Sequence, residues 1–147
     1  MGNSRHIFIQ IDTNSIIALN NPKPKNEDVR AHTLIYDQGS LALGNAVKNF
    51  TINVQTGQEI HFSIVPLELF SYAKLYFTGF LVTEDTGIEL PSQVKPDTHV
   101  LSFSIPIGNV QKNGTAVFCL NAVLETQEGK KIDICIDPRL QTEQGGG

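Results

Sequence analysis

Hydrophobic and polar residues alternate along most of the chain, and no long stretch follows the period of a helix. The alternation is clearest at the start, where Ile7, Ile9 and Ile11 are separated by Phe8 and Gln10. A period of two places successive side chains on opposite faces of a strand. The pattern therefore predicts a β protein whose first strand covers 6–12 and turns its isoleucines toward the core.

Further strands are expected wherever the same alternation returns between turn-forming residues. They cover 31–37, 50–54, 60–64, 72–83, 101–105, 115–125 and 130–136. The turn Thr56-Gly57-Gln58 predicts a hairpin of the strands at 50–54 and 60–64, and Gln127-Glu128-Gly129 predicts a second hairpin near the end. Asn113-Gly114 is typical of another turn.

Two polar segments interrupt the strands. Thr13–Arg30 is expected to be a loop with one helical turn at Ser15–Leu19, capped by Asn14. Glu84–Asp97 is expected to be a second loop because it carries glycine and proline without alternation. Such a series of short strands predicts an all-β fold, a two-sheet antiparallel β-sandwich of jelly-roll or immunoglobulin-like type with about seven or eight strands.

The length of 147 residues fits a single domain over 1–147, with flexible ends over about 1–5 and 141–147. The net charge is −4, and acidic and basic residues are interspersed. Nucleic acid is not expected as a partner, because phosphate neutralisation needs a basic stripe. The chain has no apolar leader at its start and no apolar run long enough to span a bilayer, so a cytoplasmic location without a membrane span is expected.

The two cysteines, Cys119 and Cys135, fall in the strands of the last predicted hairpin. A turn near Glu128-Gly129 would place Cys119 close to Pro138 and Cys135 close to Ala122. That gap is too long for a disulfide. The sequence therefore predicts two buried free thiols.

No pattern of catalytic residues is visible. Each of the four histidines, His6, His32, His61 and His99, stands alone in or beside a strand, outside any known catalytic motif. A lone strand histidine most often faces solvent. Glycines do not cluster into a phosphate loop, and no Cys or His spacing suggests zinc. We therefore expect a protein that is not an enzyme.

Oxygen-rich segments follow the first and last strands, at Asp12-Thr13-Asn14 and at Asp137. Carboxylate and amide oxygens suit calcium and sugar hydroxyls, so Asp12, Asn14 and Asp137 are candidate ligand-binding residues and candidate calcium ligands. They can share a site if the first and last strands run parallel. The alternative is that Asp12 begins a turn through its own side chain and Asp137 simply precedes a proline.

Three tyrosines are the candidates for stacking on a sugar ring. They are Tyr36, Tyr72 and Tyr76, and we select Tyr36 as a ligand-binding candidate. A tyrosine half-buried in a sheet is the commoner case.

Several blocks of the sequence resemble the PixA/AidA inclusion-body protein family. The opening strand followed by Asp-Thr and isoleucine, over 6–17, is similar to the family's start, and 20–24 resembles its Asn-Pro loop. The stretch 44–52, the turn and strand at 57–64, and the ending at 136–140 resemble its later blocks. The chain departs from the family in having Cys135-Ile136 where an aromatic often precedes the last Asp-Pro.

The resemblance implies a cytoplasmic, non-enzymatic protein of the kind that forms inclusions and is tied to host association or late growth. It also implies sugar binding. The first hypothesis is accordingly a lectin-like, carbohydrate-binding sandwich that assembles as a dimer. The alternative is a structural or storage protein that self-assembles without a specific small ligand.

Overall fold

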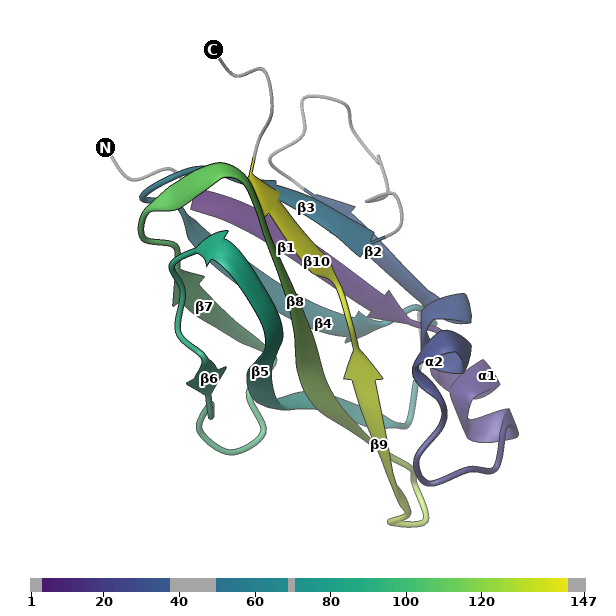
Figure 1. The fold of residues 1–147 in the computed structure, drawn as a ribbon. Helices are drawn as coiled ribbons and strands as arrows, with labels where there is room; N and C mark the ends of the chain where they lie inside the picture. Colours follow the sequence, from purple (N-terminus) through teal and green to yellow (C-terminus); the bar gives the residue numbers. More distant parts are fainter. Residues whose placement is uncertain (1–3, 38–49, 69–70, 143–147) are drawn as a thin grey trace.

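The computed structural model describes residues 4–37, 50–68 and 71–142, and in them the chain forms two facing β-sheets with two short helices at one end (Figure 1). The strands are β1 (Ser4–Ile11), β2 (Thr33–Asp37), β3 (Thr51–Val54), β4 (Glu59–Pro66), β5 (Lys74–Ile88), β6 (Gln93–Val94), β7 (Ser102–Pro106), β8 (Val110–Glu125), β9 (Lys131–Ile136) and β10 (Arg139–Thr142). The helices are α1 (Thr13–Ala18) and α2 (Asn26–Ala31).

The two sheets contain both parallel and antiparallel pairs. The four-stranded sheet has the order β2-β1-β4-β7, and the six-stranded sheet has the order β3-β10-β8-β5-β6, with β9 also paired to β8. β1 runs parallel to β4, and β10 runs parallel to β3. The predicted all-β sandwich is thus confirmed. Its sheets are mixed rather than purely antiparallel, and it has more strands than expected.

The predicted hairpin over 50–64 is wrong, because β3 and β4 belong to different sheets. The turn between them carries the chain across the sandwich and is held by the Gly57 N–H, which donates to the carbonyl of Ile107 at 3.1 Å. Both strands bury alternate residues in the same interior. Alternation alone therefore could not distinguish a hairpin from two strands that face each other across the core.

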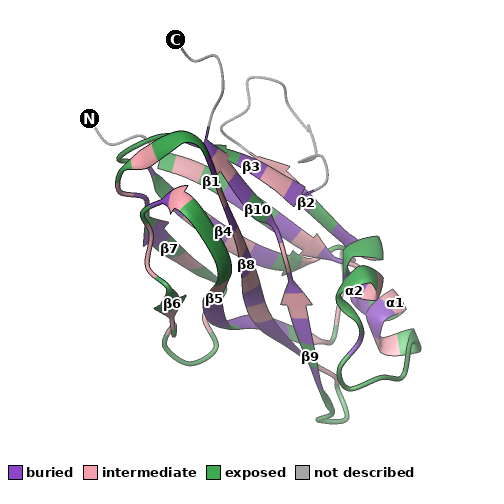
Figure 2. Cartoon of the chain, viewed as in Figure 1, coloured by how far each residue is buried: buried purple, intermediate pink, exposed green. Residues whose placement is uncertain are grey.

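The interior lies between the sheets and is filled by the inward rows of both (Figure 2). Ile7, Ile9 and Ile11 are at most 1% exposed, as the sequence predicted. Phenylalanines from both sheets meet at the centre, where the ring centroids of Phe62 and Phe118 lie 5.7 Å apart. Arg5 is on the same face of β1 as these isoleucines, at the end of the core, and its side chain is 17% exposed.

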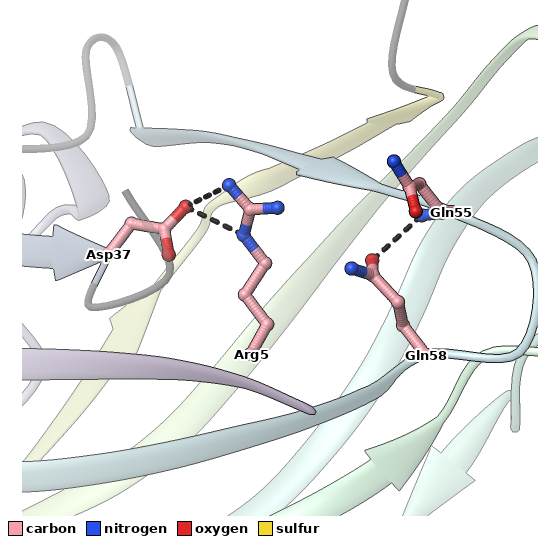
Figure 3. A network of polar contacts seen from close by, with 4 residues as sticks. All are labelled: Arg5, Asp37, Gln55 and Gln58. Atoms are coloured by element: carbon pink, nitrogen blue, oxygen red, sulfur yellow. Dashed lines mark hydrogen bonds and ion pairs between the residues drawn. The ribbon is translucent and has the colours of Figure 1, made fainter. Parts of the chain in front are cut away.

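Polar contacts close the end of the sandwich where β1 begins (Figure 3). The Arg5 guanidinium donates from its Nε to Asp37 Oδ2 at 2.8 Å, and a second nitrogen lies 2.7 Å from the same oxygen. Beside them, the Gln58 side-chain oxygen accepts from the Gln55 N–H at 2.7 Å. The interior thus ends in satisfied polar groups rather than in apolar side chains exposed to water.

The segment expected to be a loop over 13–30 contains both helices. α1 starts earlier than predicted, and its N-cap is Asp12 rather than Asn14. α2 was not predicted, because only Val29 in it is buried and six residues are too few for a clear helical period. The segment runs along the outer edge of β9, where the Asp133 N–H donates to the Pro22 carbonyl at 2.9 Å.

Two other loop and turn predictions were wrong. The loop expected over 84–97 is half strand, since β5 continues to Ile88 and β6 covers Gln93–Val94. Asn113-Gly114 lies inside β8 rather than in a turn, with Asn113 at a φ of 61°. The register of β5 and β8 shifts between Thr86 and Ile88, so the long ribbon bends there without ending.

The last hairpin, β8 and β9, is confirmed, but its two cysteines are not free. Cys119 and Cys135 form a disulfide, with their Cα atoms 5.6 Å apart, which is within the range such bonds need. The register pairs Cys135 with Asn121, one residue away from the expected Ala122. Both cysteines lie on the half-buried outer face of the sheet, not in the core.

The described residues at both ends of the chain belong to strands. Ser4 and Arg5, which we had expected to be flexible, begin β1, and 141–142 end β10. The remaining residues of the expected flexible ends, and the first part of the family-like block at 44–52, lie outside the described residues. Within the described ranges, no helix is both long enough and apolar enough to cross a bilayer.

Substitution of one buried and one exposed leucine tests the position of the core. Leu120 is 0% exposed and Leu101 is 58% exposed. We expect Leu120→Ala to lower the free energy of unfolding by about 2–5 kcal/mol, because it removes buried surface and leaves a cavity. Leu101→Ala should change it by less than about 0.5 kcal/mol. Urea denaturation measures both, and similar losses would contradict the assigned interior.

The disulfide can be tested by alkylation of the protein unfolded in urea. We expect iodoacetamide to leave Cys119 and Cys135 unmodified until a reductant is added, since neither sulfur is then a thiol. The variant Cys135→Ser should be alkylated at Cys119 without reductant, which controls for access. Alkylation of both cysteines of the unsubstituted chain, unfolded in urea without reductant, would disprove the bond.

Candidate functional site

The outer face of the six-stranded sheet carries a hollow of 580 Å³, which we call the sheet groove. Its volume is in the range of small-ligand sites, which hold about 300–1,000 Å³. It lies over β5, β8 and β9, on the side of the six-stranded sheet that faces away from the other sheet. Its lining combines outward residues of these strands with Phe80, Ala122 and Ile134, which also belong to the core.

The walls of the sheet groove come from two distant parts of the chain. On the β9 side the wall is the segment that holds Lys23 and Pro24, fixed by the Asp133–Pro22 backbone hydrogen bond. On the β5 side the wall is β6 and the residue after it, Lys95. β6 pairs with β5 through Phe80 and Leu81, so this wall is part of the sheet itself.

The floor of the sheet groove is one row of residues across three strands. Gly79 of β5 lies opposite Asn121 of β8, which in turn lies opposite Cys135 of β9. Gly79 follows a shift in register after Phe77, and it leaves the floor low because it has no side chain. A Cβ at Gly79 would meet only ordinary contacts, the nearest being Asn121 Nδ2 at 3.6 Å.

The polar groups of the sheet groove are mixed in type. Amides come from Asn26, Gln93 and Asn121, and charges come from Lys23, Lys95 and Asp133. Amides can both donate to hydroxyl groups and accept from them, carboxylates accept from them, and ammonium groups donate to them. The arrangement suits a neutral ligand with many hydroxyls better than an anion, because a carboxylate stands among the lysines.

Asp12 is used as a helix cap. Its Oδ1 accepts from the Ser15 N–H at 3.1 Å, and its Oδ2 accepts from the Ser15 hydroxyl at 2.7 Å. The hydrogen bond from the Ser15 hydroxyl, then that from its N–H, hold the pKa of Asp12 below its usual value. This is the alternative in which Asp12 begins a turn through its own side chain.

Thr13 and Asn14 bind the carboxylate of Glu68. Glu68 accepts from the Thr13 N–H at 3.2 Å, from the Asn14 N–H at 3.4 Å, and from the buried Thr13 hydroxyl. The start of α1 is thus neutralised by a residue far along the chain. Asn14 is itself exposed beside a smaller hollow of 330 Å³ that also has Tyr72 in its lining.

Asp137 pairs with Arg30 of α2, whose guanidinium donates to its Oδ2 at 2.7 Å. Its other oxygen is buried and has no hydrogen-bond partner among the described residues. Asp12 also lies near α2, since its N–H donates to the His32 carbonyl at 2.9 Å. The two carboxylates are therefore both next to this helix, but each has its own partner.

The predicted calcium ligands do not form a cage. Both oxygens of Asp12 are taken up by Ser15, and Asp137 is bound to Arg30. In the part of the chain that the structure describes, no three His, Cys, Asp or Glu side chains lie together as a metal site requires. The positions of Asp12 and Asp137 therefore do not favour a shared calcium ion. Calcium binding stays a prediction from the sequence alone.

The tyrosines have three different environments. Tyr36 lies on the outer face of the four-stranded sheet, opposite Phe8, so it is on the other side of the molecule from the sheet groove. Tyr76 is 6% exposed and packs against His99 with ring centroids 4.4 Å apart. Tyr72 is 81% exposed, and of the three tyrosines it is the most accessible to a planar ligand.

The sequence predicted that each histidine stands alone, but two of them lie together. His6 and His61 come from neighbouring parallel strands and stack with ring centroids 4.7 Å apart. His61 Nδ1 lies 2.5 Å from the Ser104 hydroxyl, and its Nε2 lies 3.7 Å from Glu59. Such a set resembles a nucleophile, base and orienter. It lies, however, on the open face of the sheet, with Ser104 and Glu59 exposed.

Sequence reasoning missed the residues of the sheet groove. Gly79, Asn121 and Asp133 lie inside strands and belong to no motif, and their only signal is that they occupy outward positions. The walls cannot be inferred from that signal, because they depend on where segments near Pro24 and Val94 are placed.

The fold has relatives among solved structures, whereas no protein-family model and no curated protein matches the sequence. One similar structure is the inclusion body protein PixA from Burkholderia cenocepacia J2315, with a TM-score of 0.65 over 97% of this chain and 96% of that chain. The two are 12% identical, so the likeness concerns the fold. The expected resemblance to PixA-type proteins is confirmed at that level.

The N-cap gives a prediction with a defined pH dependence. We expect Asp12→Ala to lower the free energy of unfolding by about 1 kcal/mol at pH 7, because the Ser15 N–H loses its acceptor. The folded pKa of Asp12 lies below the ordinary 3.8, so its charged form stabilises fully above that pH. This contribution is lost as the pH falls through the folded value.

Urea denaturation of the native chain and the variant at pH 7 and at about pH 3 measures the difference. Asp12→Asn is the control, since asparagine caps about as well as aspartate but has no charge to lose. Equal stability of native chain and Asp12→Ala at pH 7 would contradict the capping role.

Proposed function

We propose that this chain is a non-enzymatic, inclusion-body-type β-sandwich that binds a glycan in the sheet groove. The observation that carries the proposal is the mixed set of amides and charges around a low glycine floor. Sugar recognition needs several fixed donors and acceptors that match the directions of ring hydroxyls. Residues on strands provide them because their rotamers are held by the sheet.

The likeness to PixA supports the inclusion-body part of the proposal. That protein is described as an inclusion body protein, and it shares the arrangement of nearly the whole chain. The proposal of a non-enzymatic role rests on the position of His61, Ser104 and Glu59 on the open face of the sheet. Efficient acyl transfer needs a site that excludes water and holds an oxyanion, and an open sheet face offers neither enclosure nor a fixed substrate.

The glycan proposal can be tested on an array of diverse glycans, followed by titration of the best ligand by NMR. We expect Gly79→Val to weaken binding at least tenfold, because a branched side chain would rise from the floor into the space of the ligand. The fold should accept valine, since a Cβ has room there and valine favours strands.

The matched control is Asn53→Val, an exposed site on β3 at the other edge of the same sheet. It should bind like the native chain. Absence of binding to any glycan, or equal binding by Gly79→Val, would contradict the proposal. Repeating the array with EDTA and with calcium tests the predicted ion, and we expect no difference, because Asp12 is bound to Ser15 and Asp137 to Arg30 rather than to each other.

Self-assembly without a specific small ligand remains the alternative function. A specific observation favours it: the outer face of the four-stranded sheet has apolar, exposed residues, with Phe8, Leu34 and Val65 each at least 37% exposed. The expected cytoplasmic location also stays a prediction. The disulfide bears on it, because such bonds persist mainly in oxidising compartments.

A further inference from the structure

Among the described residues, the outer face of the four-stranded sheet has no Asp, Glu, Lys or Arg over its three central rows. In the middle row, Phe8 of β1 lies between Tyr36 of β2 and Ser63 of β4, and Ser63 lies opposite Ser102 of β7. All four residues point away from the core, since their neighbours along each strand form the inward rows. An aromatic pair therefore stands at the centre of this sheet, flanked by small hydroxyl residues.

The described residues of the flanking rows also include no Asp, Glu, Lys or Arg. On the helix side, Gln10 lies between Leu34 and Val65. On the other side, His6 stacks on His61, and His61 lies opposite Ser104. We call these three rows the uncharged face. Carboxylates occur only beyond it, with Glu59 in the next row.

The opposite outer face of the molecule differs strongly. On the six-stranded sheet a single row contains Lys74, Glu125 and Lys131, and Asp133 follows in the next row. The Lys131 ammonium lies 3.8 Å from the Glu125 carboxylate. Charged side chains thus occur near the end of the β8–β9 hairpin, whereas the described residues of the uncharged face include no Asp, Glu, Lys or Arg. Loss of charge together with exposed aromatics is the composition that marks the centre of protein interfaces.

We infer that the uncharged face is an interface between two copies of this chain, packed sheet on sheet across a two-fold axis. A two-fold axis brings each patch onto the same patch of its partner. A charged partner would gain nothing from a surface without countercharges, whereas a second copy meets no like charges on it. This inference rests on the self-assembly alternative and is independent of the sheet groove, which lies on the opposite face.

The size of the face sets the strength of the pair. Strands about 4.8 Å apart, rising about 3.3 Å per residue, give four strands of this length a face of roughly 400 Å². Two copies would then bury about 800 Å² in total, below the roughly 1,200–2,000 Å² of stable specific complexes. The pair should accordingly be reversible, with monomer and dimer both present across the micromolar range.

Sedimentation of the full native chain over about 1–1,000 µM tests the inference. We expect the mean mass to rise from the monomer's 16.1 kDa toward twice that value with concentration. Phe8→Lys should keep the chain monomeric throughout, because the axis would bring two buried ammonium groups together. Leu81→Lys is the matched control, since Leu81 is 44% exposed on the six-stranded sheet and Phe8 is 37% exposed.

Ser63→Lys provides a second variant at a site that is already polar, in case Phe8→Lys does not fold; circular dichroism checks both. A native chain that stays monomeric overturns the inference. So does association of both lysine variants at the native level, or loss of association in Leu81→Lys. Glycan binding is measured separately at monomeric concentrations, so a failure of either proposal is distinguishable from a failure of the other.

Discussion

The structure depends on one constraint, the exclusion of water from the space between two sheets. Each strand contributes every second side chain to that space, and residues such as Ile9, Phe62 and Leu120 are fully buried in it. Burial of apolar surface provides most of the free energy of folding. The turn after β3, which might have closed a hairpin, instead takes the chain to the other sheet, because this lets both strands bury their faces in one interior.

The same alternation leaves two outer faces that the core does not need, and they differ in character. The face of the six-stranded sheet carries charges and amides, and it becomes a groove because Gly79 lowers its floor and flanking segments form walls. The face of the four-stranded sheet has no Asp, Glu, Lys or Arg among the described residues of its central rows. One surface is thus suited to a polar ligand, and the other is suited to a flat apolar partner.

The end of the sandwich near the helices shows how local demands take up groups that look functional. A carboxylate after a strand can bind an ion, but it can also satisfy the free N–H groups of a helix start. Asp12 and Glu68 both do the latter for α1, and Asp137 balances Arg30. Backbone groups that lack partners are costly to bury. These carboxylates therefore bind groups of the protein itself and not a ligand.

The sequence by itself determined the β class, the inward isoleucines of β1, the final hairpin and the absence of long helices. Each follows from short-range periodicity, which depends only on which residues are neighbours along the chain. Tertiary structure alone decided which strands pair, where Cys119 and Cys135 meet, and which distant segments wall the groove at Gly79. These depend on contacts between residues far apart in sequence, and alternation is the same whichever sheet a strand joins.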